Sequence, residues 1–123
     1  MLSYVYSVSH TWMTETLADK LTDYALGLSF NELPDNVVHE TKRRFIDALG
    51  CSLGALEADA PKIAERVAHR IKASPGAMTM YGSVTSPDMA AFVNGILIRY
   101  LDFNDTYLSK EPAHPSDNLA AVL

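Results

Sequence analysis

Apolar side chains recur at helical spacing along most of the chain, and prolines, glycines or capping residues interrupt them. The first run predicts a helix from about Thr14 to Phe30, because residues three and four apart fall on one face of a helix. Asn31–Pro34 breaks it, and Pro34 followed by Asp35 is typical of a first helical turn. The predicted apolar face of the first helix comprises Leu17, Leu21, Tyr24, Ala25 and Leu28, and the predicted core positions of the second are Val38, Phe45, Leu49, Ser52, Leu53 and Leu56.

Two glycines, Gly50 and Gly54, lie four residues apart in the second predicted helix. Glycine costs a helix interior up to about 1 kcal/mol relative to alanine. We expect the close approach of a neighbouring helix to offset this cost.

A third helix is predicted next, with Asp59 as its cap and Pro61 in its first turn. It places three apolar residues on one side: Ile63, Val67 and Ile71. Ser74–Gly76 predicts a turn, and Ala77–Tyr81 predicts a small strand or an extended connection.

Ser86–Asp88 opens a fourth predicted helix with good capping chemistry. Its apolar residues cover most of its sides, which is typical of a helix buried among others. They are Met89, Ala91, Phe92, Val93, Ile96, Leu97, Ile98, Tyr100 and Leu101. Pro112 and Pro115 then mark a loop, and Ser116 is expected to cap a fifth helix.

These elements together predict an all-α fold, a packed helical bundle joined by short loops. Residues 1–13 are expected to form an N-terminal extension, and residues 14–123 the helical part. The chain has 123 residues, 48% of them hydrophobic and 20% charged, which fits one globular unit with a core.

The net charge of −5 disfavours a nucleic-acid partner, since such proteins normally carry a basic face. One basic run exists, Lys42–Arg44, and Glu40 and Asp47 flank it. We interpret this run as a solvated helix face.

Cys51 is the single cysteine, so an intrachain disulfide is impossible, and we interpret it as a buried structural thiol. This cysteine usage fits a reducing cytoplasm. The N-terminal residues lack the features of a secretory signal, and no window reaches the length of a membrane span. A cytoplasmic, soluble protein with no membrane partner is therefore expected.

Candidate chemistry concentrates in Arg99–Leu123, the segment RYLDFNDTYLSKEPAHPSDNLAAVL. If the fourth helix continues into it, Asp102, Asp105 and Thr106 share one face, and Asp102 is expected to be partly buried. The alternative is structural: Arg99 pairs with Asp102, and the Asn-Asp-Thr run ends the helix.

His114 lies between two prolines, and histidine is the residue type best suited to general acid–base catalysis near neutral pH. The alternative is an ordinary surface histidine, which is the interpretation we give to His10, His39 and His69. The free N–H groups of Ser116–Asn118 would suit a substrate carboxylate, with plain capping by Ser116 as the alternative.

A divalent metal held by Asp102, Asp105 and His114 is a further hypothesis, although nothing in the sequence fixes a coordinating geometry.

The run LDFNDTYL followed by AHPSDNL resembles the MmgE/PrpD family, and within it the 2-methylcitrate dehydratase branch. FIDALGCSLGA is similar to the family's early glycine-bearing helix, and AAFVNG to the helix that enters the active-site motif. The resemblance covers about Thr14 to Leu123. Asp-x-x-x-Thr and His-Pro in this order are a specific signal, whereas either element alone would be weak.

The resemblance implies a cofactor-independent lyase without a metal, acting on tricarboxylates in the methylcitrate cycle of propionate catabolism. It implies a large helical domain, a smaller α+β lid, an active site between them, and a homodimer. It assigns catalytic roles to Asp102, Thr106 and His114, with Arg99, Lys110 and Ser116 as candidate substrate-binding residues. Asp117 is a neighbour with no assigned role. Dehydration of 2-methylcitrate to 2-methyl-aconitate, or of citrate, needs an acid and a base, and His114 is the best candidate for one of them.

Family members are several times longer than this chain, so it is expected to form an incomplete N-terminal part of the large helical domain. A triply anionic substrate needs more cationic partners than the segment offers, and we expect little or no activity from the chain alone. The alternatives are a non-catalytic helical association module, a cis-aconitate decarboxylase-like lyase and a metal-dependent enzyme.

Overall fold

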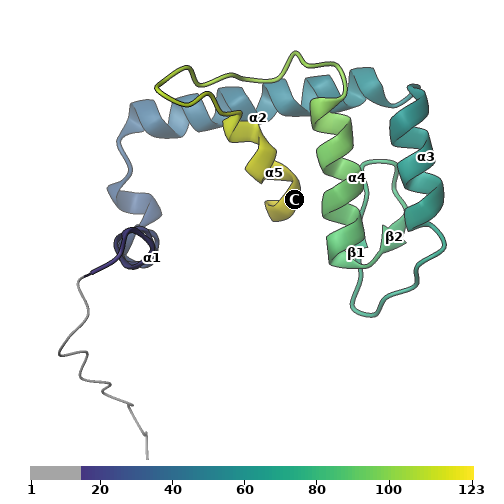
Figure 1. Cartoon of the computed structure of the whole chain (residues 1–123), viewed down its shortest axis with the longest axis horizontal. Helices are drawn as coiled ribbons and strands as arrows, with labels where there is room; N and C mark the ends of the chain where they lie inside the picture. The colour runs from purple at the N-terminus through teal and green to yellow at the C-terminus, as the bar shows by residue number, and fades with distance from the viewer. Residues whose placement is uncertain (1–14) are drawn as a thin grey trace, which may run out of the picture. The chain divides into compact units, whose positions relative to one another are not determined.

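The computed structural model describes residues 15–123 (Figure 1). The predicted extension, residues 1–13, and the predicted helix start at Thr14 lie outside the described residues. The chain divides into two units, Met1–Pro34 and Asp35–Leu123.

The first unit holds helix α1 (Leu17–Gly27) and a short 3₁₀ helix, η1 (Phe30–Glu32). The Thr16 hydroxyl accepts from the Asp19 backbone N–H at 3.2 Å, and the Asp19 carboxylate accepts from the Thr16 N–H at 2.8 Å. This capping box makes Thr16 the N-cap of α1. The helix is therefore shorter at both ends than predicted, and none of its residues is buried.

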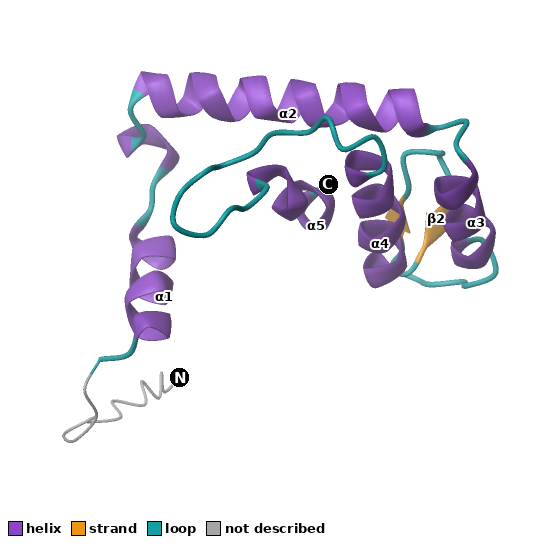
Figure 2. Cartoon of the chain, turned by 45° about the horizontal axis from the view of Figure 1, so that its top comes forward, coloured by secondary structure: helices purple, strands orange, loops and turns teal. Residues whose placement is uncertain are grey.

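The second unit is built from helices and one small hairpin (Figure 2). Its elements are α2 (Asp35–Ala55), α3 (Asp59–Ala68), β1 (Ala77–Met78), β2 (Val84–Thr85), α4 (Pro87–Arg99), a 3₁₀ helix η2 (Pro115–Asn118) and α5 (Leu119–Val122). Helix α4 packs against α2, α3 and α5. The described residues confirm the all-α prediction, to which the antiparallel pair β1–β2 is a minor addition.

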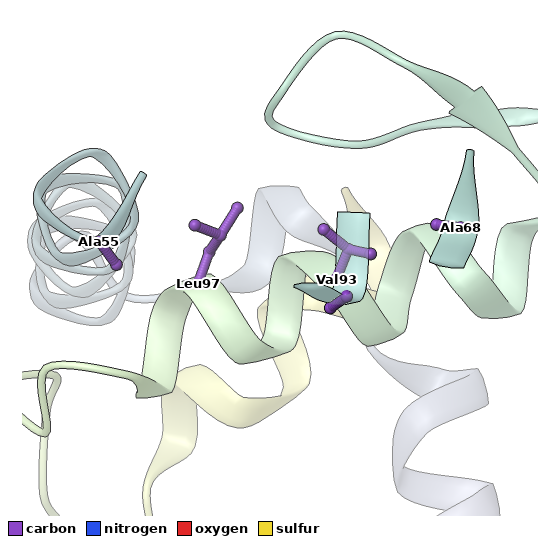
Figure 3. Close-up of a cluster of buried hydrophobic side chains, with 5 residues drawn as sticks. Ala55, Ala68, Val93 and Leu97 are labelled. Atoms are coloured by element: carbon purple, nitrogen blue, oxygen red, sulfur yellow. The ribbon is translucent and has the colours of Figure 1, made fainter. Parts of the chain in front are cut away.

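The core of the second unit is made largely of small side chains. Val93 and Leu97 of α4 lie between Ala55 of α2 and Ala68 of α3 (Figure 3). A second cluster joins Ala48, Ile98 and Ala120. Alanines let the backbones of α2 and α3 come close to α4, where the two branched side chains fill the space.

This packing corrects several predicted core positions. Leu53 was expected in the core and is 67% exposed, whereas Ser52 is buried as expected. Ile63 and Val67 of α3 are exposed, as is Ile71 beyond its end, and the buried side of α3 is Pro61, Ala64 and Ala68. The N-cap of α3 is Ala58 rather than Asp59. Hydrophobicity predicted that the large apolar residues would be buried, but the closely packed helix surfaces bury small ones instead.

The start of α4 is as predicted, with Ser86 at the N-cap and Pro87 as the first helical residue. The helix is less enclosed than its composition indicates, since Phe92 is 53% exposed.

Cys51 is buried, as interpreted. The pKa of its thiol is raised, mainly because of burial and to a smaller extent because of the negative charge of Asp47. Within residues 15–123, no helix combines the length and apolar character that crossing a membrane requires.

The buried side chain of Asn94 fastens the hairpin segment to α4. Its Oδ1 accepts from the Met80 backbone N–H at 2.8 Å, and its Nδ2 donates to the Met78 carbonyl at 3.4 Å. The Tyr81 hydroxyl donates to the Leu56 carbonyl, one residue past the end of α2. These contacts hold the strand that was expected within Ala77–Tyr81, which covers only Ala77–Met78.

The two glycines of α2 differ. A Cβ on Gly54 would lie 3.0 Å from Leu101 Cδ1, whereas a Cβ on Gly50 would meet nothing within 4 Å. A close contact is found at Gly54, although it comes from the Leu101 side chain just after α4 and not from a neighbouring helix. The expectation is wrong at Gly50.

Replacing each glycine by alanine tests this difference. Gly50→Ala should raise the free energy of unfolding by about 0.5–1 kcal/mol, because it gains helix propensity without a clash. Gly54→Ala should give a smaller gain or a loss, because Leu101 must move. Urea denaturation of the matched pair measures the order, and an equal gain from both would contradict the close packing.

Asn94→Ala should lower the free energy of unfolding by about 1–3 kcal/mol, because it leaves the partly buried Met80 N–H without its partner. The control is Asn36→Ala on the exposed start of α2, where a change within about 0.5 kcal/mol is expected. Thermal denaturation measures both variants, and equal midpoint temperatures would show that Asn94 does not fasten the hairpin.

Candidate functional site

Helix α4 ends at Arg99 and does not continue through the polar segment. Residues 100–114, here called the polar loop, run alongside α2 before entering η2 (Figures 1 and 2). The Asp102 N–H donates to the Arg99 carbonyl at 3.0 Å, and Asp102 adopts a positive φ of 54°. The proposed helical face of Asp102, Asp105 and Thr106 is therefore wrong, because the backbone turns at Asp102.

Arg99 is surrounded by partners from the segment itself. Its Nη2 lies 3.0 Å from Asp102 Oδ1, its Nη1 donates to Asn104 Oδ1 at 2.6 Å, and its Nε lies 3.7 Å from Asp117 Oδ1. The structural Arg99–Asp102 pair is confirmed. The Asp102 side chain is 76% exposed, not partly buried as expected. Two carboxylates already compensate the charge of Arg99, which weakens it as a lone anion-binding group.

Asp105 is the most enclosed acidic group of the polar loop, with only 7% of its side chain exposed. Its Oδ2 accepts from Arg44 Nη1 at 2.8 Å, and its Oδ1 accepts from the Ser116 backbone N–H at 3.0 Å. Burial by itself raises the pKa of Asp105, but the hydrogen bonds from Ser116 and Arg44 outweigh burial and hold this pKa below its usual range. Asp105 is therefore ionised and paired at neutral pH.

The interpretation of Lys42–Arg44 as a solvated face needs one correction. Arg43 does pair with Glu40 on the exposed side of α2, at 2.7 Å. Arg44 instead reaches across to Asp105, 61 residues later in the chain. Periodicity along α2 carries no information about a partner that distant.

Ser116 is 1% exposed and is not a helix cap. His114 is the N-cap of η2, and Asn118 is the N-cap of α5. The Ser116 hydroxyl accepts from the buried Asn104 side chain at 2.7 Å, while its N–H is bound by Asp105. The anion at this amide is thus an internal carboxylate, and a role of Ser116 in substrate binding stays a prediction.

His114 and Thr106 face each other beside a small backbone bridge. Tyr107 and Ala113 exchange both backbone hydrogen bonds, at 2.8 and 3.0 Å, so the residues next to them lie opposite each other on one face. His114 Nδ1 lies 2.7 Å from the Asp105 carbonyl oxygen and 3.5 Å from Thr106 Oγ1.

The contact with the Asp105 carbonyl sets the tautomer of the half-buried His114 imidazole. A carbonyl oxygen only accepts hydrogen bonds, so Nδ1 must carry the proton. In the neutral ring Nε2 then has a free lone pair and can accept a proton. This is the arrangement of a general base whose other nitrogen is held by an orienting group.

Lys110 lies near the exposed tip of the polar loop and has no ion-pair partner among residues 15–123. Its ammonium group can therefore meet an anionic ligand without first breaking an internal pair.

No three His, Cys, Asp or Glu side chains in the described part of the chain form a group suited to a metal ion. The described residues therefore do not support the hypothesis that Asp102, Asp105 and His114 together bind a metal ion.

An open hollow of about 540 Å³ lies on the α2 side of Asp105. Its lining residues are Glu40, Arg43, Arg44, Ile46, Asp47 and Asp105. Acidic groups outnumber basic ones here, which disfavours a tricarboxylate at this place.

Because the folded state holds Asp105 ionised more tightly than the unfolded chain does, its pairing contributes stability above the ordinary Asp pKa of about 3.9. This contribution is lost as the pH falls through the lower folded-state pKa. Asp105→Asn removes the titration, so its free energy of unfolding should fall less steeply below about pH 5 than that of the parent chain. Urea unfolding at a series of acidic pH values measures both slopes, and equal slopes would contradict the lowered pKa.

The family model of the MmgE/PrpD N-terminal domain matches residues 19–123. The 2-methylcitrate dehydratase of Salmonella typhimurium is 36% identical over 110 residues, covering 84% of this chain and 21% of the relative. The probable 2-methylcitrate dehydratase of Saccharomyces cerevisiae is 37% identical over 111 residues, covering 84% of this chain and 20% of the relative.

A more distant relative is the human cis-aconitate decarboxylase, 31% identical over 115 residues, which cover 90% of this chain and 23% of the relative. The chain spans about a fifth of the length of the curated relatives it matches. No solved structure matches it significantly.

Proposed function

The chain belongs to the MmgE/PrpD family, and from this premise we propose that it supplies one wall of the active site of a lyase that dehydrates 2-methylcitrate or a related tricarboxylate. The observation that carries the proposal is the pairing of His114 with Thr106 beside the Asp105 carbonyl. The hydrogen bond to the Asp105 carbonyl occupies Nδ1 and leaves Nε2 free, in a chain similar to 2-methylcitrate dehydratases.

Dehydration removes a proton from a carbon beside a carboxylate and expels the hydroxyl group of the neighbouring carbon. The electron pair of the broken C–H bond forms the double bond, and the hydroxyl leaves with a second proton as water. We assign the first proton to Nε2 of His114, because Nδ1–H is already engaged. Thr106 Oγ1 lies beside the imidazole and suits a hydrogen bond to a substrate carboxylate or hydroxyl.

Asp102 is the third proposed catalytic residue. Its exposed carboxylate is paired with Arg99, and among residues 15–123 no hydrogen bond or ion pair joins it to His114. A role in proton transfer therefore requires the substrate to meet Asp102 directly. We therefore do not assign Asp102 the role of orienting His114, because the Asp105 carbonyl already binds Nδ1 of the imidazole.

Charge balance supports the need for further residues. A tricarboxylate carries up to three negative charges, and Arg99 is compensated by Asp102 and Asp117. Lys110 is the unpaired cation that the polar loop offers. The remaining four fifths of a relative's length would have to supply the other cations, so we propose little or no turnover by the chain alone. The homodimer and the cytoplasmic location also stay predictions.

A dehydration assay tests the proposal. The chain alone is compared with the chain fused to the remaining four fifths of the Salmonella relative, and the conjugated product is followed by absorbance. We expect turnover only by the fusion, and a loss of about 10²–10⁴-fold with His114→Gln, the usual range for removing an acid–base group. His39→Gln, at an exposed histidine of α2, is the matched control and should keep full turnover.

Undiminished turnover of the His114→Gln fusion would favour the helical association module, and appreciable turnover by the chain alone would overturn the need for further residues. If the fusion does not fold, the substitution is made at the aligned position of the intact Salmonella enzyme. Release of carbon dioxide from cis-aconitate would indicate the decarboxylase alternative that the human relative suggests. Loss of turnover in excess chelator would indicate a metal-dependent enzyme.

A further inference from the structure

The imidazole of His114 is held by a backbone atom rather than by a side chain. The Asp105 carbonyl oxygen lies 2.7 Å from Nδ1, so the orientation of the ring depends on where the backbone of Asp105 is placed. A loop carbonyl is a reliable acceptor only when the peptide that carries it is fixed, since loops otherwise sample several conformations.

Two elements fix that peptide through the Asp105 carboxylate. Arg44 binds one oxygen from α2, and the backbone N–H of Ser116 binds the other from η2. Ser116 lies two residues after His114, and the bridging residue Ala113 lies directly before it. Asp105 therefore contacts the imidazole with its carbonyl and the backbone just beyond His114 with its carboxylate.

We propose that Asp105, locked by Arg44, is a positioning residue that holds His114 in the Nδ1–H tautomer and keeps Nε2 free. Neither Asp105 nor Arg44 touches the reacting atoms in this proposal. The inference rests on the proposed function only for what Nε2 does; the tautomer itself is a property of this chain. The other oxygen that contacts Nδ1, the hydroxyl oxygen of Thr106, lies farther away, at 3.5 Å.

The tautomer is measured directly in the chain with ¹⁵N-labelled histidine. Long-range ¹H–¹⁵N correlation spectra at about pH 8, above the ordinary imidazole pKa of about 6.5, distinguish a protonated from an unprotonated ring nitrogen. In the parent chain we expect Nδ1 of His114 to carry the proton. His39 and His69, which are exposed, serve as internal references that should favour the Nε2–H form of free imidazole side chains.

Neighbouring arginines provide the matched pair of variants. Arg44→Met removes the partner of Asp105 and should shift His114 towards the Nε2–H tautomer. Arg43→Met removes the exposed pair with Glu40, one residue away, and should leave the spectrum of His114 unchanged. Asp105→Ala should lose the Nδ1–H tautomer as the dominant form, whereas Asp105→Asn keeps an acceptor for the Ser116 N–H and should retain more of it.

An Nε2–H tautomer in the parent chain would overturn the proposal. So would an unchanged Nδ1–H tautomer in Arg44→Met, or an equal shift in Arg43→Met. If Asp105→Ala does not fold, as circular dichroism would show, Arg44→Met and Asp105→Asn still decide. Because the readout is a tautomer and not a rate, it separates this proposal from the proposed function: a held tautomer together with an inactive fusion would reject the function alone.

Discussion

The carboxylate of Asp105 receives hydrogen bonds from two parts of the chain that are distant in sequence, Arg44 of α2 and the backbone N–H of Ser116 in η2. With 7% of the side chain exposed, an ionised carboxylate there is stable only when it is paired. The pair in turn fixes the path of the polar loop against α2. The placement of His114 depends on this constraint, because its imidazole is bound by the carbonyl of the same residue.

Many polar side chains between Arg99 and Asp117 form hydrogen bonds or ion pairs with one another. Arg99 holds Asp102, Asn104 and Asp117, and Asn104 holds the hydroxyl of Ser116. This network explains why so many polar groups follow an apolar helix, since most of them bind one another. The groups that remain available to a ligand are Nε2 of His114, the hydroxyl of Thr106 beside it, the unpaired ammonium group of Lys110 and the exposed carboxylate of Asp102.

Local signals in the sequence predicted local features. Ser86 and Pro87 marked the start of α4, and Gly54 marked a close contact, because both depend on short-range chemistry. The pairing of Arg44 was missed, because it depends on a partner 61 residues later in the chain. The helical continuation through Asp102 was also wrong, since the backbone turns there with a positive φ that helical periodicity does not indicate. The core was misplaced in the same way: the burial of Ala55 and the exposure of Leu53 follow from how closely α2 approaches α4. Family membership, by contrast, was visible in the two motifs and is confirmed by the match over residues 19–123.

The most direct test of the constraint at Asp105 is a double-mutant cycle on the free energy of unfolding, with Arg44→Met, Asp105→Asn and the double variant. If the pair locks the polar loop onto α2, the two substitutions should be coupled by about 0.5–3 kcal/mol, the range for side chains in direct contact. Additive effects, with no coupling energy, would contradict the claim that this pair places the loop and with it His114.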